Sequence, residues 1–236
     1  MSIPKGMKAL KSSSSFVEVE IDRCCDWQGL YCSDEGWHYF RAVLQEYKEN
    51  PKLKYEKSIL KIYYKKYQPQ TLLECLFYGE ENQYEHLVTN ELLELPWGIR
   101  FKSPDKNHQH YGPNSKSFGE KEINRIINVY ESISTEGYQP EKYKDGYIRG
   151  FYLRRGDDYR FMITGGQHRL AALKELGYES IVVKIHVKDK RVVDRKDVKN
   201  WKNVREGMYN EELALKVFDQ FFDQNGREKA EKIGVI

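Results

Sequence analysis

The chain has 236 residues, 39% hydrophobic and 32% charged, which suits one large domain with a modest core. Its 39 Lys and Arg residues nearly balance 36 Asp and Glu residues, which argues against a broad basic face for duplex DNA. No apolar run approaches the ~20 residues of a membrane span, and the N-terminal MSIPKGMKALKSSSS lacks the apolar region of a secretory signal. We therefore expect a cytoplasmic protein with no membrane-spanning segment.

Residues 1–90 are expected to form a mainly helical N-terminal extension. FVEVEI at 16–21 alternates apolar and charged side chains, which predicts a half-buried strand. After it, apolar and aromatic residues recur at helical spacing up to Pro69 and again beyond it. The predicted helices cover residues 37–47, 55–67 and 70–77.

The cysteines do not have the pattern of a metal centre. Zinc sites show paired C-x-x-C spacing or accompanying histidines, and neither pattern accompanies Cys24, Cys25, Cys32 and Cys75. We expect reduced, partly buried thiols and no metal site.

Residues 91–190 are expected to form an α+β core. LLELPWGIRF, broken by Pro96, predicts a strand over 91–101 followed by a turn, and a polar loop comes next. A helix is predicted over 120–135, capped by Gly137, and Gly156-Asp157-Asp158 predicts the turn of a hairpin. The remaining predicted elements are strands over 148–153, 159–163 and 181–187 and a helix over 167–176. Residues 191–236 are expected to form a C-terminal helical segment packed on this core, with helices over 197–204, 211–222 and 227–232.

FMITGGQHRLAALKELGYESIVVKI, residues 161–185, runs from an apolar strand through Gly165-Gly166 into a polar trio that opens a helix. Two glycines allow close approach of a ligand to the backbone, and the free N–H groups of a helix's first turn favour an anion. His168 and Arg169 would add charge-assisted donors, and Gln167 a neutral one. The alternative is a purely structural glycine turn, with the Arg169 side chain exposed to solvent. The Walker and dinucleotide-binding motifs are both absent.

The segment ITGGQHRLAALKELGYESIVVKI resembles the central motif of the ParB/sulfiredoxin superfamily, in which a strand leads to a G-x-[HR]-R-x-x-A turn and helix. Upstream, INRIINVYESISTEGYQP is similar to the helix that precedes this motif in the family. The resemblance covers about 70 residues, from Gly119 to Val187, and residues 91–101 would correspond to the opening strand. It implies a ParB/sulfiredoxin-like core.

The positions at which this chain departs from the family pattern indicate which of the family's known activities it could share. Sulfiredoxin carries its catalytic cysteine in G-G-C-H-R, where this chain has Gln167, and an amide cannot be the nucleophile that reduces a sulfinic acid. ParB partition proteins are CTP-dependent clamps with a helix-turn-helix domain after this core. Only about 49 residues follow Val187, without a basic pair of helices. The resemblance therefore does not favour sulfiredoxin chemistry or partition-style DNA loading.

The stand-alone, small-molecule branch of the family implies a kinase-like phosphotransferase that acts on a small hydroxylated metabolite, such as a sugar or amino-acid precursor. Its nucleotide, a nucleoside triphosphate or diphosphate (ATP, ADP or CTP) with Mg²⁺, would be held at Gly165, Gly166, Gln167, His168 and Arg169. The C-terminal WKNVREGMYNEELALKVFDQFF resembles stand-alone ParB-like proteins associated with surface-polysaccharide gene clusters. The alternative is a non-catalytic ParB-like regulator that binds a nucleotide or DNA.

Two further groups could act in such a site. His108 and His110 in HQHYGP are predicted cofactor-binding residues of the cleft, although a metal site or a solvated loop would also explain them. A kinase needs a carboxylate near the acceptor hydroxyl. The candidates are Glu120, Glu122, Asp157 and Asp158, and His168, Glu120 and Asp158 are the predicted catalytic set. Glu120 could instead stabilise a helix start, and Asp157-Asp158 a turn. No role is expected for His38, His86 or His186.

Overall fold

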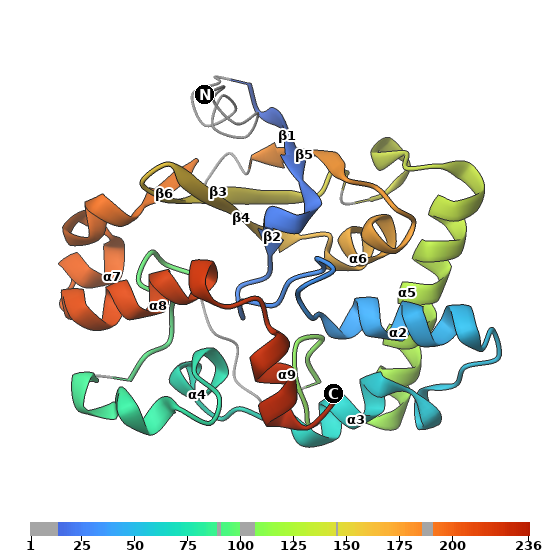
Figure 1. Cartoon of the computed structure of the whole chain (residues 1–236), viewed down its shortest axis with the longest axis horizontal. Helices are drawn as coiled ribbons and strands as arrows, with labels where there is room; N and C mark the ends of the chain where they lie inside the picture. The colour runs from blue at the N-terminus through green and yellow to red at the C-terminus, as the bar shows by residue number, and fades with distance from the viewer. Residues whose placement is uncertain (1–13, 89–90, 100–106, 145, 186–190) are drawn as a thin grey trace.

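A computed structural model describes residues 14–88, 91–99, 107–144, 146–185 and 191–236. The protein is mixed α+β, as the sequence predicts. Within the described residues, a six-stranded mixed sheet lies along the top of the molecule in Figure 1, with α5 (Lys116–Glu136) running down beside it and most of the other helices below it. The strands are β1 (Phe16–Glu20), β2 (Cys24–Cys25), β3 (Arg149–Arg155), β4 (Asp158–Gly165), β5 (Ser180–Ile185) and β6 (Val192–Asp194). The α-helices are α2 (Tyr39–Glu49), α3 (Ile59–Lys66), α4 (Leu72–Leu76), α5 (Lys116–Glu136), α6 (Gln167–Glu175), α7 (Lys202–Arg205), α8 (Glu211–Asp223) and α9 (Arg227–Ile233).

The sheet has the order β1-β5-β3-β4-β2, and β6 pairs with β3. At its centre is the predicted antiparallel β3–β4 hairpin, whose turn places Gly156 at a φ of 62°. The β1–β5 pair is antiparallel, whereas β2–β4, β3–β5 and β3–β6 are parallel. The sheet thus combines strands from all three predicted segments of the chain, since β1 and β2 precede residue 91 and β6 follows residue 190.

The strand predicted over residues 91–101 is not present in the described part, residues 91–99. Pro96 lacks a donor for a ladder, and the segment turns back on itself as the Leu95 amide donates to the Ile99 carbonyl. Asn203 completes the arrangement, because its side chain donates to the Leu95 carbonyl at 2.7 Å. This segment is therefore held by α7 and lies outside the sheet.

Most of the predicted helices are confirmed, with small changes at their ends, but the helix predicted over 197–204 is a 3-10 helix at Arg195–Asn200 followed, after Trp201, by the short α7. The α5 helix begins four residues earlier than predicted because the Ser115 hydroxyl accepts a bond from the Phe118 amide. It ends at Gly137, whose φ of 74° marks the predicted C-cap. The stretch predicted as one helix over 55–67 is divided by Ser58, which caps α3. No described helix is long and apolar enough to cross a membrane.

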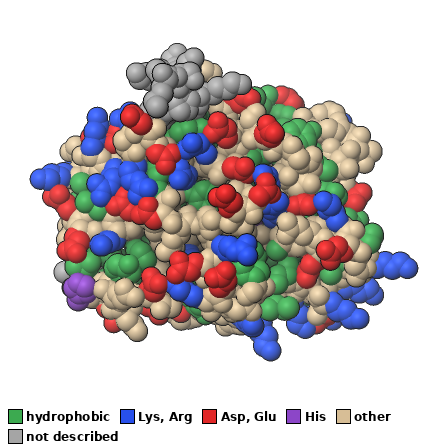
Figure 2. Space-filling model, viewed as in Figure 1, with side chains coloured by type: hydrophobic (Ala, Val, Ile, Leu, Met, Phe, Trp, Pro, Cys, Tyr) green, Lys and Arg blue, Asp and Glu red, His purple; other side chains and the backbone are tan. Residues whose placement is uncertain are grey.

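The tyrosines of α2 and α3 form a buried aromatic stack below the sheet. Tyr39 and Tyr63 are fully buried, and their rings stack with centroids 4.6 Å apart. The four cysteines are buried free thiols, and burial raises the pKa of Cys75 to about 12. On the face visible in Figure 2, Lys and Arg side chains alternate with Asp and Glu, so this face has no continuous basic stripe.

Candidate functional site

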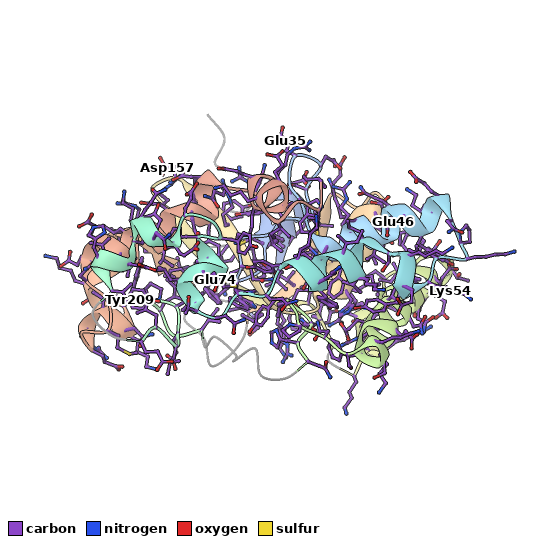
Figure 3. All side chains as sticks on the ribbon, turned by 90° about the horizontal axis from the view of Figure 1, so that it is seen from below. Glu35, Glu46, Lys54, Glu74, Asp157 and Tyr209 are labelled. Carbon is purple, nitrogen blue, oxygen red and sulfur yellow. The ribbon has the colours of Figure 1, made fainter. Side chains whose placement is uncertain are left out.

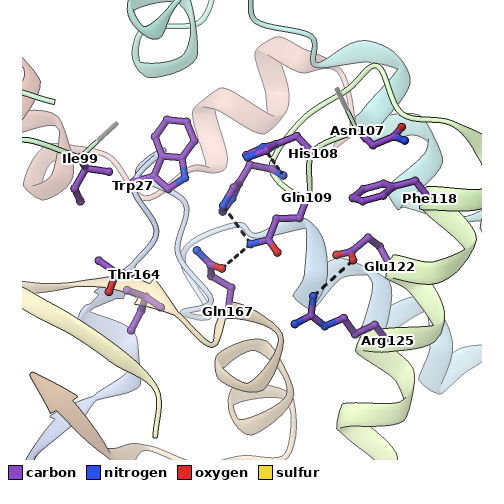
Figure 4. Close-up of a pocket in the computed structure, with 12 residues that line it drawn as sticks. Trp27, Ile99, Asn107, His108, Gln109, Phe118, Glu122, Arg125, Thr164 and Gln167 are labelled. Carbon is purple, nitrogen blue, oxygen red and sulfur yellow. Dashed lines mark hydrogen bonds and ion pairs between the residues drawn. The ribbon is translucent and has the colours of Figure 1, made fainter. Parts of the chain in front are cut away.

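A pocket of about 440 Å³ opens beside the first turn of α6 (Figure 4). Its walls come from the loop at residues 107–110, the α5 helix, the end of β4 and the loop around Trp27. Three predicted site residues, His108, His110 and Gln167, line it together. The full lining is Trp27, Ile99, Asn107, His108, Gln109, His110, Phe118, Glu122, Arg125, Ile163, Thr164 and Gln167.

The glycine turn places Gln167 at the pocket. Gly166 precedes α6 with a φ of 101°, and a Cβ there would lie 2.9 Å from the Ile148 side chain, so glycine is required on both counts. Gln167 is 6% exposed, and its Oε1 accepts a bond from Gln109 at 2.7 Å. Within the described residues its Nε2 has no partner. The first turn of α6 thus offers an amide donor and backbone N–H groups at the pocket.

The other polar residues of the motif are held by the protein. Arg169 is buried, donates to the Gly146 carbonyl and lies 4.8 Å from the centre of the Tyr143 ring. Beside Gly165 lies a different guanidinium, that of Arg149, whose buried Nε has no partner among the described residues. The five residues predicted to hold phosphates therefore do not converge on one surface, and only Gln167 lines the pocket.

His168 points into the protein and supports a pocket carboxylate. Its Nε2 lies 3.0 Å from Glu122 Oε2, and its ring packs on Phe40 with centroids 4.0 Å apart. Burial lowers the pKa of His168 despite the nearby carboxylate, so the ring is a neutral donor. Burial would raise the pKa of Glu122, but the hydrogen bond from His168 and the charge of Arg125 lower it. The pocket therefore contains an ionised carboxylate, with Arg125 3.8 Å away (Figure 4).

A second carboxylate–imidazole pair has the reverse orientation. His110 lines the pocket, and behind its Nδ1, at 3.7 Å, lies Oδ2 of Asp26, which is 1% exposed. The carboxylate accepts bonds from the backbone amides of Gln28 and Leu30 at 2.8 and 3.0 Å. Burial would raise the pKa of Asp26, but the nearby imidazoles of His110 and His38 and the bond from the Leu30 amide lower it to about 2.

His108 completes the histidine side of the pocket. Its ring stacks on Tyr111 at 4.7 Å and lies 5.0 Å from that of His110. Within the described residues there is no group of three or more His, Cys, Asp or Glu side chains that could hold a metal ion.

Two of the predicted catalytic carboxylates lie away from the pocket. Glu120 is on the exposed face of α5, 3.9 Å from Lys116. Asp158 binds Arg23 and Arg160 at the turn end of the β3–β4 hairpin. Its neighbour Asp157 lies in the turn, toward the rim of the molecule in Figure 3. Of the four candidate carboxylates, only Glu122 lines the pocket.

Sequence reasoning missed Asp26, Trp27 and Arg125. Asp26 opens a tight turn in which the Gly29 amide donates to its carbonyl, and the D-x-x-G spacing is a weak signal of that turn. Nothing in the sequence connects this turn with a histidine 84 residues further along the chain. Comparison with known proteins found no matching family model, no matching curated protein and no matching solved structure.

Proposed function

We propose that the protein is a nucleotide-dependent phosphotransferase that acts on a small hydroxylated metabolite. The observation that carries this proposal is the pocket at the first turn of α6, where Gln167 meets both an ionised carboxylate and a histidine, and its Nε2 has no partner among the described residues. A helix start with free N–H groups favours an anionic ligand such as a phosphate.

The chemistry of phosphoryl transfer fits what the pocket offers. Such transfer depends on positioning and on electrostatic stabilisation, and its protein base has mainly to orient the acceptor hydroxyl. Glu122 and His110 are two proton-accepting side chains in one pocket of about 440 Å³, within the range of small-ligand sites. Mg²⁺ would arrive with the nucleotide phosphates. The resemblance to stand-alone ParB-like proteins supports the same class, with a sugar or amino-acid precursor of surface polysaccharide as acceptor.

One observation favours a second candidate, a non-catalytic regulator that binds a nucleotide or DNA. His168 and Arg169, the two residues of the motif predicted to donate to phosphates, are bound instead by Glu122 and the Gly146 carbonyl. A site with fewer cations aimed at the phosphates would bind a nucleotide without activating it. This candidate predicts ligand binding without turnover, and DNA affinity that falls steeply with salt.

A thermal-shift and turnover screen tests both candidates. ATP, ADP and CTP, each with and without Mg²⁺, are added to the wild type, to Gln167→Ala and to the exposed control Gln83→Ala. We expect a nucleotide to raise the Tm of the wild type and of Gln83→Ala, with a clearly smaller rise for Gln167→Ala. Transfer of phosphate to a sugar or amino-acid acceptor then supports the enzyme, and stabilisation without transfer supports the regulator. No stabilisation by any nucleotide rejects nucleotide binding.

A further inference from the structure

We propose that His110 is the catalytic residue that takes the proton from the acceptor hydroxyl, and that Asp26 is its positioning residue. The proposal rests on the proposed function, because it assigns one step of that transfer. The sequence predicts His110 as a cofactor-binding residue of the cleft and gives no role to Asp26.

The hydrogen bonds around His110 define its tautomer. The Gln109 amide nitrogen lies 3.2 Å from His110 Nε2 and also donates to Gln167 Oε1 at 2.7 Å. A nitrogen that receives a bond from an amide N–H must carry a lone pair. The Gln28 amide nitrogen is 3.5 Å from Nδ1 and donates to Asp26 Oδ2 at 3.0 Å, so the shorter amide contact, at Nε2, assigns the lone pair to Nε2 and the proton of a neutral ring to Nδ1. That nitrogen faces the protein, with the Tyr39 hydroxyl at 3.2 Å and the Asp26 carboxylate at 3.7 Å. The basic nitrogen is therefore the one on the pocket side.

Asp26 is held rigidly behind the ring. Its Oδ1 accepts bonds from the Gln28 and Leu30 amides, and its Oδ2 accepts one from the Gln28 side chain at 3.0 Å. Trp27 packs edge-on against His110 with centroids 5.4 Å apart. A buried carboxylate behind an imidazole holds the tautomer and stabilises the imidazolium when the ring takes a proton.

The charged environment favours His110 over Glu122 as the base. Glu122 already accepts a bond from His168 and lies 3.8 Å from Arg125, and both neighbours stabilise its ionised form. An acid that is more readily ionised is a weaker proton acceptor. The titratable side chains around the His110 ring or at its backbone are Asp26, His38, Tyr39, Tyr63, His108, Glu122 and His168. Among these, Asp26 is the carboxylate within 4 Å of the ring.

The acceptor oxygen forms a bond to the terminal phosphorus of the nucleotide, and the bond from that phosphorus to the leaving diphosphate oxygen breaks. The hydroxyl proton moves to His110 Nε2, the ring becomes an imidazolium beside Asp26, and the proton is later released to water. The Gln109 amide lies 3.2 Å from Nε2. In the proposed step the acceptor hydroxyl takes the place of this amide beside Nε2.

The test measures hydrolysis of ATP and of CTP with Mg²⁺, with water as acceptor, across pH. We expect His110→Gln to lower kcat by about 10²-fold or more, the ordinary contribution of a positioned base, with KM for the nucleotide unchanged. Imidazole in the buffer should partly restore kcat to His110→Ala, which a merely structural role would not produce. His86→Gln, at an exposed histidine, is the matched control and should keep the wild-type kcat.

Asp26→Asn tests the positioning role. Loss of the negative charge makes the imidazolium less stable, so the acidic limb of the kcat profile should move to lower pH while kcat falls. If this variant does not fold, the His110 variants decide the proposal. If the wild type turns over nucleotide and His110→Gln has the same kcat and pH profile, His110 is not the base, and the phosphotransferase proposal is unaffected. No transfer of phosphate by the wild type to water or to a sugar or amino-acid acceptor would reject the phosphotransferase and this role with it.

Discussion

The two carboxylate–imidazole pairs of the pocket use the same groups in opposite order. In the Glu122–His168 pair the carboxylate lines the pocket and the neutral imidazole lies behind it. In the Asp26–His110 pair the imidazole lines the pocket and the carboxylate lies behind it. In each pair a buried partner lies behind the group that lines the pocket. One wall of the pocket therefore has the ionised Glu122 carboxylate, and the other has the His110 imidazole.

The difference between the pairs lies in how deeply the charge is buried and how many bonds hold it. Asp26 has several N–H donors, two of them backbone amides, whereas Glu122 has one imidazole and an exposed arginine nearby. The first pair should therefore contribute more to folding, and the second should tolerate substitution better. The following predictions test this contrast.

The largest effect is expected at Asp26. Asp26→Ala leaves the amides of Gln28 and Leu30 without acceptors in a buried turn, and loss of one partner from a buried charged network costs about 3–5 kcal/mol. Urea unfolding at pH 7 measures the loss. Asp34→Ala is the matched control, because this ion-paired carboxylate is exposed and should cost less than about 1 kcal/mol. A loss below that level at Asp26 would contradict the contrast.

The next effect is a pH dependence from His38, which lies 3.9 Å from Asp26. Burial lowers the pKa of His38 from 6.5 to about 4 despite the charge of Asp26. The stabilisation that comes from keeping His38 neutral is therefore fully present above pH 6.5 and is lost as the pH falls from 6.5 through 4. The free energy of unfolding should decrease by about 3 kcal/mol over this range, because each pKa unit corresponds to ~1.4 kcal/mol. Urea midpoints between pH 7.5 and 4 should fall accordingly.

His38→Asn should flatten that dependence, because asparagine keeps the cap on the Phe40 amide without a titrating ring. His86→Asn, at an exposed site, should retain the wild-type slope. Equal stability of the wild type at both ends of the range would show that His38 is not held neutral.

Arg169, the neighbour of His168, should matter more for stability than for the ligand. Its buried guanidinium donates to the Gly146 carbonyl, and a hydrogen bond to a charged group contributes about 2 kcal/mol. We expect Arg169→Ala to lose that amount in urea unfolding, and exposed Arg205→Ala less than about 0.5 kcal/mol. If Arg169→Ala reduces the nucleotide-induced rise in Tm more than Gln167→Ala does, Arg169 contributes to nucleotide binding after all.

The smallest effect is expected from Glu122→Gln. The amide oxygen can still accept the bond from His168 Nε2, so stability should change by less than about 1 kcal/mol. Glu120→Gln, on the exposed face of the same helix, is the control and should change stability by less than about 0.5 kcal/mol. A loss at Glu122 comparable to that at Asp26 would remove the distinction between the two pairs.

Local patterns in the sequence determined most of the secondary structure. The alternation in FVEVEI, the glycines at 137 and 156 and the apolar spacing of α2, α5 and α8 depend on neighbours within a few residues, and the structure agrees with each. The predicted strand around Pro96 failed because a partner from far along the chain, Asn203, holds that segment.

The candidate site depended on the tertiary structure. The sequence by itself placed a polar trio at the start of α6 and two histidines in a loop, but it could not say which way each side chain points. Successive residues of a helix project about 100° apart, so Gln167 reaches the pocket while His168 and Arg169 face the protein. The contact of Asp26 with His110 joins residues 84 positions apart, and only chain folding brings such residues together.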